Sequence, residues 1–279
     1  MLDIIRHVVD LRERVAHWRR QDKSIGLVLT MGALHQGHLA LVKRSLRACD
    51  RTIATIFVNP KQFGLEEDFD KYPRSEQNDI ASFTDAGVDL LFAPNNEEMY
   101  PKGFSTQVKV GVLGDILEGV HRPNFFDGVA TIVSKFLILT RPDKAFFGEK
   151  DYQQLMIIKR IVCDLEISTL VEGVETVREK DGLAISSRNI YLNEEERLLA
   201  PTLYKTILEV SHRIKSGKEI NKHESWGRKN LLRSGFSDVD YLSVHDAETF
   251  KPGFRVGHPG RVMVAAKLGH TRLIDNVET

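Results

Sequence analysis

The chain of 279 residues is long enough for one large domain or two modest ones, and its 42% hydrophobic content suits a packed core. Its 39 basic and 39 acidic residues give a formal net charge of zero, which excludes the global basic field of a protein that binds nucleic acid non-specifically. The charged N-terminus, the lack of any apolar run near the ~20 residues of a membrane span, and two distant cysteines together predict a cytoplasmic protein with reduced thiols and no membrane contact.

Apolar periodicity in the first two thirds of the chain alternates between strands and helices. We expect strands at 25–29, 52–58, 88–92, 145–147 and 169–177, and helices at 4–20, 39–48, 75–86, 127–139 and 152–165. His38 would open the second helix. The stretch 95–126 reads as irregular, with a short strand at 106–110 and a short helix at 113–118. This alternation predicts an α/β domain with a parallel sheet covered on both faces.

The pattern changes after Asp181-Gly182. A long helix should begin at Asn193, with Glu196 as its capping-box partner, and should end at Gly217. A helix at 223–233 and strands at 239–244, 261–268 and 271–276 follow. We therefore expect a Rossmann-type catalytic domain over residues 1–180 and a smaller α+β lid domain over residues 181–279.

The stretch from Thr30 to His38 joins a strand to a helix through Gly32 and Gly37. Unpaired amides and the dipole at a helix N-terminus favour a phosphate, and glycine lets a nucleotide approach the backbone. His35 and His38 can donate hydrogen bonds to phosphate oxygens. Zinc is a poor alternative ligand, because the pair lacks an intervening Glu and a nearby third ligand.

Three other groups of polar residues follow predicted strands or lie at the domain boundary. Gly148-Glu149-Lys150-Asp151 opens a helix and offers a lysine for phosphate. Of the two glutamines that follow, Gln153 and Gln154, one can bind a polar ligand while the other faces solvent. Ser186, Ser187 and Arg188 form a mobile-looking anion clamp. Asn59, Gln62 and Tyr72 offer uncharged hydrogen-bonding groups that suit a small hydroxylated acid, although alone they would be ordinary loop residues.

None of these groups supplies an evident nucleophile with its base. A triphosphate reacting with an external acid needs positioning and charge stabilisation, which histidine, lysine, serine and arginine can provide. The residues therefore indicate nucleotidyl transfer, in which an acid oxygen attacks the α-phosphate of ATP and pyrophosphate leaves.

Several motifs in the same order resemble the pantothenate synthetase (pantoate–beta-alanine ligase) family, part of the wider nucleotidyltransferase superfamily with an H-x-G-H motif. They are Thr30 to His38, Phe57 to Phe63, Tyr72-Pro73-Arg74, Gly128 to Thr131, Phe147 to Gln154, Asp181 to Asn189 and Leu273 to Asn276. The resemblance runs over essentially the whole chain.

The resemblance implies a cytoplasmic homodimer that condenses pantoate with beta-alanine through a pantoyl adenylate and releases pyrophosphate and AMP. It implies His38, His35, Lys150 and Arg188 as catalytic residues. The ATP contacts that it implies are Met31, Gly32, Ala33, Leu34, His35, Gln36, Gly37, His38, Gly148, Glu149, Lys150, Asp151, Val177, Ile185, Ser186, Ser187 and Arg188. Gln62, Gln154 and Asn59 would hold pantoate and beta-alanine, and Mg²⁺ would arrive with the ATP phosphates rather than at a metal site of the protein.

The chain departs from the family pattern at a few positions. Leu29 stands where proline usually precedes Thr-Met-Gly, Ile185 stands where methionine is common, and Arg122-Pro123-Asn124-Phe125-Phe126-Asp127 replaces a usual Arg-Pro-Gly-His-Phe-Arg. Two alternatives stay open on the residues alone: a related nucleotidyltransferase with another acceptor, and a nucleotide-binding protein without activity. The first would have no reason for the Asn59 to Phe63 motif, and the second would have no reason to keep the charged residues intact.

Overall fold

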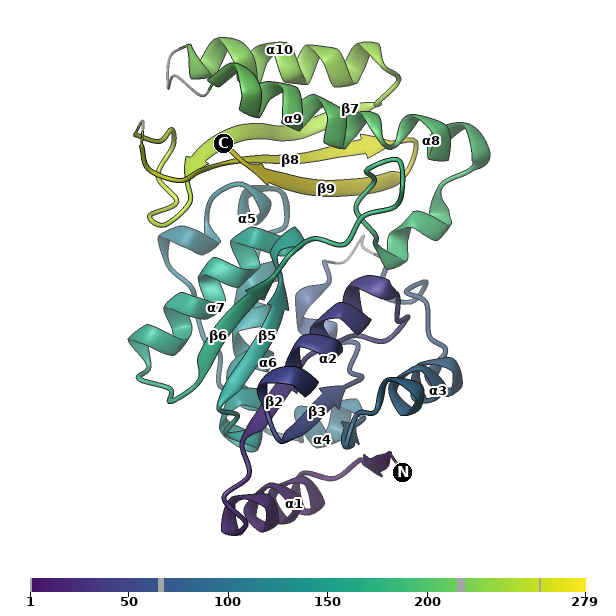
Figure 1. Ribbon diagram of the computed structural model, residues 1–279, viewed down its shortest axis with the longest axis vertical. Coiled ribbons are helices and arrows are strands. Elements are labelled where there is room, and N and C mark those ends of the chain that lie inside the picture. The colour runs from purple at the N-terminus through teal and green to yellow at the C-terminus, as the bar shows by residue number, and fades with distance from the viewer. Residues whose placement is uncertain (1, 65–67, 215–218, 256) are drawn as a thin grey trace. The chain divides into compact units, whose positions relative to one another are not determined.

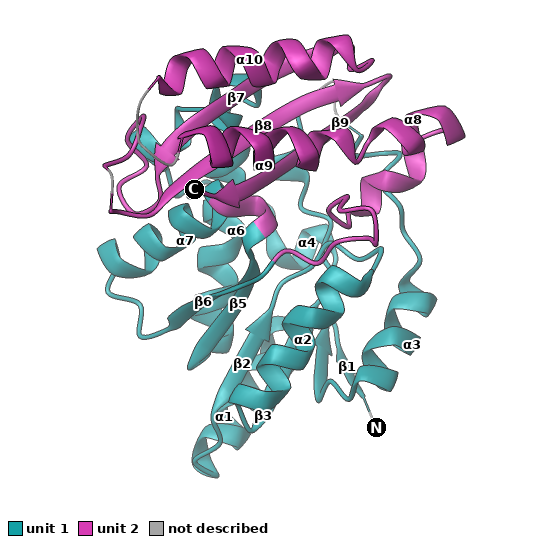
Figure 2. Cartoon of the chain, turned by 45° about the horizontal axis from the view of Figure 1, so that its top comes forward, with its two compact units in different colours: residues 1–149, 153–175 teal, residues 150–152, 176–279 magenta. Residues whose placement is uncertain are grey.

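The structure, a computed structural model, describes residues 2–64, 68–214, 219–255 and 257–279. The chain divides into two compact units, one of Met1–Glu149 with Gln153–Glu175 and one of Lys150–Tyr152 with Thr176–Thr279 (Figure 2). The second unit thus begins a few residues before the expected boundary, and it also takes the short segment 150–152. The catalytic and lid roles of the two parts stay predictions.

The first unit is built on a six-stranded sheet in which every pair of neighbouring strands is parallel (Figure 1). Its strands are β1 (Asp3–Ile5), β2 (Ile25–Val28), β3 (Arg51–Thr55), β4 (Leu90–Phe92), β5 (Lys144–Gly148) and β6 (Leu170–Val174), in the order β1-β4-β3-β2-β5-β6. The order of β2 to β6 is that of a Rossmann sheet, and the direction in which successive strands are added reverses between β2 and β5. Ligands of such sheets bind beyond the carboxyl ends of the strands at this reversal point.

Helices pack on both faces of this sheet. They are α1 (Val8–Arg20), α2 (Gln36–Ala48), α3 (Glu76–Ala86), α4 (Asn96–Met99), α5 (Glu118–His121), α6 (Phe125–Thr140) and α7 (Tyr152–Asp164). Leu91 of β4 shares one buried cluster with Leu41 of α2 and Phe83 of α3. The next residue, Phe92, points to the opposite face and contacts Phe136 of α6, with ring centroids 6.1 Å apart. The α/β class with a doubly covered parallel sheet is therefore confirmed.

The second unit pairs three antiparallel strands with helices. Its elements are α8 (Glu194–Leu199), α9 (Thr202–Ile214), α10 (Ile220–Arg233), β7 (Asp238–Asp246), β8 (Gly260–Leu268) and β9 (Thr271–Glu278). Val262 and Val264 of β8 lie in one core with Ile207 of α9 and Leu231 of α10. Because side chains alternate along a strand, Arg261 of β8 lies on the face away from these helices.

Several expected elements are wrong in detail. The expected helix 4–20 starts only at Val8, because residues 3–5 form β1 beside β4. The long helix from Asn193 is two helices, because Pro201 lacks the amide that would continue α8. The capping box of Asn193 and Glu196 is confirmed.

The described residues at 106–110 form no strand, and the expected helix 113–118 is replaced by a 3-10 turn at Val112–Gly114 and by α5. The expected helix end at Gly217 lies outside the described residues. No helix in the described parts of the chain has the length and apolar character needed to cross a membrane.

Candidate functional site

The loop after β2 is held by hydrogen bonds to the neighbouring strand β3. The Thr30 amide donates to Thr55 Oγ1 at 3.2 Å, and Thr30 Oγ1 donates to the Thr55 carbonyl at 2.6 Å. The Gly32 amide donates to Thr30 Oγ1 at 3.2 Å, and the Phe57 amide donates to the Thr30 carbonyl at 3.1 Å. Thr30 therefore fixes the start of the loop, through bonds to the neighbouring chain segment and to Gly32 within the loop.

The middle of the loop is held by Asp79 of α3, a residue that the sequence did not single out. Its buried carboxylate accepts from the Ala33 amide at 3.0 Å and from the Leu34 amide at 2.8 Å. Gly32 and Ala33 have φ values of +81° and +51°, and a Cβ on Gly32 would lie 2.8 Å from Asp79 Oδ2. Glycine is thus required at position 32, because the backbone there is left-handed and because this carboxylate approaches closely.

His35 and His38 lie side by side at the start of α2, which begins at Gln36 and not at His38 as expected. His35 is the N-cap, and its Nδ1 accepts from the Gly37 amide at 3.2 Å. An accepting Nδ1 carries no proton in a neutral ring, so the N–H donor of that ring is Nε2. The two imidazole rings stack with centroids 4.0 Å apart and an interplanar angle of 19°.

These contacts change which groups can bind phosphate. The amides of Gly32, Ala33, Leu34 and Gly37 all have partners inside the first unit. The main-chain anion site expected from the glycines is therefore largely filled by the protein itself. Phosphate contacts from the side chains of the histidine pair stay a prediction.

The loop after β3 folds into a 3-10 turn, Pro60–Gln62, which Asn59 holds in place. Asn59 is buried; its Oδ1 accepts from the Tyr100 hydroxyl at 2.7 Å, and its Nδ2 donates to Gln62 Oε1 at 2.9 Å and to the Gly128 carbonyl at 3.2 Å. Burial raises the pKa of Tyr100, so its hydroxyl stays a donor.

Gln62 contacts the loop after β2, because its Nε2 lies 3.1 Å from the sulfur of Met31. The expected residue Tyr72 is buried and packs against Phe63, with ring centroids 5.9 Å apart. The structure thus brings Gln62 beside the loop of the histidine pair and makes Asn59 its support.

The two adjacent glutamines of α7 have different surroundings. Gln153 is buried: its Nε2 donates to the carbonyls of Leu113 and Ile116, each at 2.8 Å, and its Oε1 accepts from the Glu118 amide at 3.2 Å. The expectation that one glutamine faces solvent is therefore wrong, because Gln153 anchors the segment before α5. The Gln154 side chain is half-buried and has no hydrogen-bond partner among the residues that the structure describes.

A cavity of about 360 Å³ opens beside the loop, beyond the carboxyl ends of β2, β3 and β4. Met31 and Asp79 line it together with Phe57, Arg74 and Asn95. Arg74 donates to the Phe69 carbonyl at 2.8 Å and lies over the Phe69 ring at 5.2 Å. The cavity lies at the carboxyl edge of the sheet, where open parallel sheets bind ligands, but its lining residues follow β2, β3 and β4 and none of them belongs to β5.

Positions that depart from the family pattern have local explanations. Asn124 precedes α6 with φ of +65°, a conformation that asparagine tolerates better than most residues other than glycine. Phe125 lies under the Arg122 guanidinium at 3.7 Å. Asp127 accepts from the Val110 amide at 2.9 Å, so it links the preceding segment to α6.

Gly148 and Glu149 end the main part of the first unit, whereas Lys150, Asp151, Val177 and the expected ATP residues from Ile185 to Arg188 belong to the second unit (Figure 2). Lys150 and Asp151 lie in a 3-10 turn, with Lys150 Nζ 4.0 Å from Asp151 Oδ1. The Val177 carbonyl accepts from the Ile185 amide at 3.0 Å, which closes a hairpin and presents the residues after it.

Ser186 caps the 3-10 turn Ser187–Tyr191, because its Oγ accepts from the Arg188 amide at 3.3 Å. The second unit therefore brings the lysine, serine and arginine groups onto one scaffold. Among the described residues no group of three His, Cys, Asp or Glu side chains is arranged to hold a metal ion.

A Rossmann-type sheet with a paired-histidine loop at the point where strand order reverses defines an α/β nucleotide-binding protein. The model of the pantoate-beta-alanine ligase family matches residues 3–278. The chain is 48% identical over 277 residues to pantothenate synthetase of Cereibacter sphaeroides, with 99% of both chains covered. It is 49% identical over 274 residues to that of Paramagnetospirillum magneticum, with 98% and 96% covered.

Solved structures give the same result. Pantothenate synthetase from Thermus thermophilus superposes with a TM-score of 0.91 at 44% identity, covering 99% of this chain and 98% of that one. Pantoate-beta-alanine ligase from Francisella tularensis, complexed with beta-gamma ATP and beta-alanine, gives 0.83 at 32% identity, with 99% and 97% covered. The chain belongs to the pantoate–beta-alanine ligase family.

Proposed function

We propose that the protein condenses (R)-pantoate with beta-alanine at the expense of ATP. A pantoate carboxylate oxygen attacks the α-phosphorus, and the bond to pyrophosphate breaks, giving pantoyl adenylate. The beta-alanine amine then attacks the acyl carbon, loses a proton, and displaces AMP. The observation that carries this proposal is the family match over residues 3–278, together with a relative of similar fold that holds ATP and beta-alanine.

The proposed roles follow from the chemistry of each group. His35 through Nε2, His38, Lys150 and Arg188 would stabilise negative charge on the phosphates, with Ser186 and Ser187 as further donors. The remaining proposed ATP contacts are Met31 to Leu34, Gln36, Gly37, Gly148, Glu149, Asp151, Val177 and Ile185. Since no side chain acts as a nucleophile, rate enhancement would come from positioning and electrostatics.

Gln62 and Gln154 are the proposed contacts for pantoate, and Gln62 also for beta-alanine. Asn59, whose side chain is occupied by Tyr100, Gln62 and Gly128, would act by orienting Gln62. Uncharged amides can bind the substrate hydroxyls without repelling its carboxylate.

Mg²⁺ would enter with ATP, held mainly by phosphate oxygens, and would neutralise charge on them. The smaller unit would act as a lid that excludes water, because an acyl adenylate hydrolyses readily. A cytoplasmic homodimer is part of the same proposal.

The test mixes pure protein with ATP, Mg²⁺ and pantoate, with and without beta-alanine. We expect pantoate-dependent pyrophosphate release, with AMP and pantothenate appearing in solution only when the amine is present. Absence of pantoate-dependent release would refute the proposal. Release with another acid in place of pantoate would favour a related nucleotidyltransferase with a different acceptor.

A further inference from the structure

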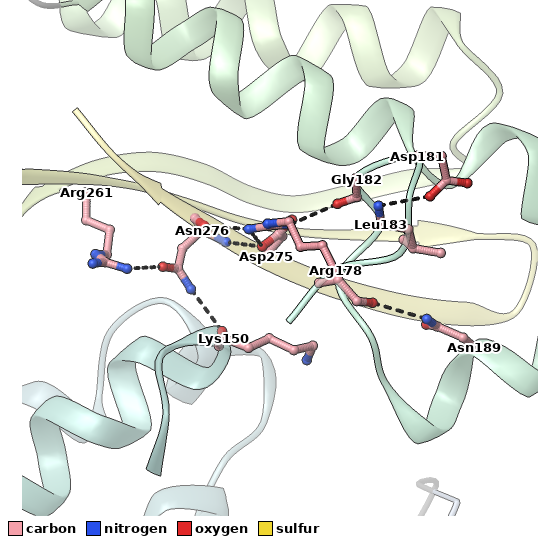
Figure 3. A network of polar contacts seen from close by, with 10 residues as sticks. Lys150, Arg178, Asp181, Gly182, Leu183, Asn189, Arg261, Asp275 and Asn276 are labelled. Atoms are coloured by element: carbon pink, nitrogen blue, oxygen red, sulfur yellow. Dashed lines mark hydrogen bonds and ion pairs between the residues drawn. The ribbon is translucent and has the colours of Figure 1, made fainter. Parts of the chain in front are cut away.

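The segment Lys150–Tyr152 is fastened to strand β9 of the second unit by a buried asparagine (Figure 3). Asn276 Nδ2 donates to the Lys150 carbonyl at 2.9 Å. Asn276 Oδ1 accepts from Arg261 Nη1 of β8 at 2.5 Å, so both ends of the amide are used. Asn276 and Arg261 are both buried, and a buried charge-assisted hydrogen bond of this kind fixes the orientation of the amide.

Tyr152 makes a second attachment of the same segment. Its hydroxyl donates to the Ala247 carbonyl at 3.0 Å, and its ring stacks on Phe250 with centroids 6.0 Å apart. The Arg261 guanidinium lies 3.8 Å from the centroid of the Tyr152 ring. Arg261 thus supports both attachments, one through Asn276 and one through the ring.

The neighbouring residue on β9 fastens the other anion-binding segment. Asp275 accepts two hydrogen bonds from Arg178, at 2.6 and 2.9 Å, and Arg178 also donates to the Gly182 carbonyl at 3.1 Å. Burial raises the pKa of Asp275 and the Arg178 contacts oppose that shift. Residues 275 and 276 therefore connect to the segments that carry Ser186 to Arg188 and Lys150, respectively.

We propose that Asn276 is a positioning residue for Lys150: by holding the Lys150 carbonyl on β9, it determines which positions the Lys150 ammonium group can reach. The inference rests on the proposed role of Lys150 at the ATP phosphates. A lysine has a long stem with many rotamers, so the position of its main chain decides which oxygens it can meet. Strand β9, paired with β8 along its whole length, is a rigid support for that main chain.

The test compares Asn276→Asp with the parent protein in pantoate-dependent pyrophosphate release at varied ATP. The aspartate keeps the acceptor for Arg261 but replaces the donor to Lys150 with an oxygen, which repels the carbonyl. We expect kcat/KM for ATP to fall by about tenfold or more, because a small misplacement of a positioned group is costly. The KM for pantoate should change by less than about twofold, since the lost contact involves no residue proposed to bind pantoate.

The double variant, Lys150→Ala with Asn276→Asp, distinguishes a positioning role of Asn276 from a merely structural one. Lys150→Ala removes the ammonium group but keeps the carbonyl that Asn276 holds. If Asn276 acts through Lys150, adding Asn276→Asp to Lys150→Ala should cost less than about twofold more. Asn230→Asp is the matched control: it removes the amide donor of a 2.9 Å bond to the Thr206 hydroxyl in the same unit and should leave the kinetics unchanged.

An equal penalty from Asn276→Asp in both backgrounds, or no penalty in either, would overturn the inference. If Lys150→Ala alone leaves the kinetics unchanged, the role of Lys150 fails instead, and with it the basis of the inference. Should Asn276→Asp fold poorly, Tyr152→Phe tests the second attachment. It removes the hydroxyl that donates to the Ala247 carbonyl and keeps the ring. It should show the same non-additivity with a smaller loss, and a penalty that persisted beside Lys150→Ala would contradict the inference.

Discussion

Asp79 follows Ala33 by 46 positions in the chain, yet its carboxylate fixes the backbone of the loop after β2. One oxygen accepts from Ala33 and the other from Leu34, so both acceptors are committed to a single conformation of the loop. The carboxylate also occupies amides that a phosphate would otherwise use. The carboxylate therefore preorganises the loop, which agrees with the proposal that side chains stabilise the phosphate charge.

Asp79→Asn tests this support. The amide group would place a donor against a main-chain donor, so one of the two hydrogen bonds is lost inside a buried site. Losing a charged, buried hydrogen bond costs about 1.5–3 kcal/mol, and we expect a lower melting temperature together with a kcat/KM for ATP reduced by about tenfold or more. Asp85→Asn, on the exposed side of the same helix, is the control and should match the parent protein. Unchanged ATP kinetics in Asp79→Asn would show that the loop does not need the carboxylate.

Single residues differ in how well the sequence predicts them. The histidine pair could be found because its spacing and flanking glycines lie within one short stretch. Asp79 was not identified and the role of Gln153 was missed, because their partners are main-chain groups far along the chain, at positions 33–34 and 113–118. Asn59 was found as a polar loop residue, but its burial and its support of Gln62 depend on Tyr100, which only the fold brings near.

At the scale of elements, helix α6 and the turn Pro60–Gln62 are fitted to each other through one glycine. A Cβ on Gly128 would lie 2.0 Å from the Lys61 carbonyl oxygen and 2.9 Å from the Gln62 amide nitrogen. These main-chain atoms cannot move aside as the end of a flexible side chain can. Gly128 therefore sets how close Gln62 sits to the helix that supports it.

Gly128→Ala should push the turn away from α6 and displace Gln62. We expect kcat/KM for pantoate to fall by about tenfold to a hundredfold, with a smaller change in the KM for ATP, because the turn carries a proposed contact of the acid and none of the phosphates. Ile138→Ala is a suitable control, since that side chain is exposed on the same helix. Steady-state kinetics with each substrate varied would settle the point; an equal loss for both substrates would argue for general unfolding of the site.

Elements were predictable where local signals were strong. The capping box at Asn193 and the left-handed stop at Gly87, with φ of +85°, lie where the residues indicate. Strand β1 was missed because three residues carry too little periodicity, and their pairing with Leu90 to Phe92 is a tertiary contact. The break at Pro201 could have been predicted, because proline cannot extend a helix. It was missed because the apolar stripe continues past Pro201.

At the scale of the whole molecule, the proposed ATP contacts are distributed over two compact units. The strand alternation predicted the parallel sheet but not its order, because order depends on long-range pairing. Nor could the sequence assign residues 150–152 to the second unit, since they follow β5 directly and are joined to β9 through Asn276 only in three dimensions.

Hydrogen exchange provides a test of this distribution. With ATP and Mg²⁺ but no pantoate, no adenylate can form, and ordering by the nucleotide should slow amide exchange in peptides over 30–38, 150–152 and 185–188. Peptides of α10, whose residues carry no proposed contact, should exchange at unchanged rates and serve as the internal control. Protection confined to residues 30–38 would remove the second-unit residues from the proposed nucleotide contacts, whereas protection in all three peptides is what a nucleotide held by both units requires.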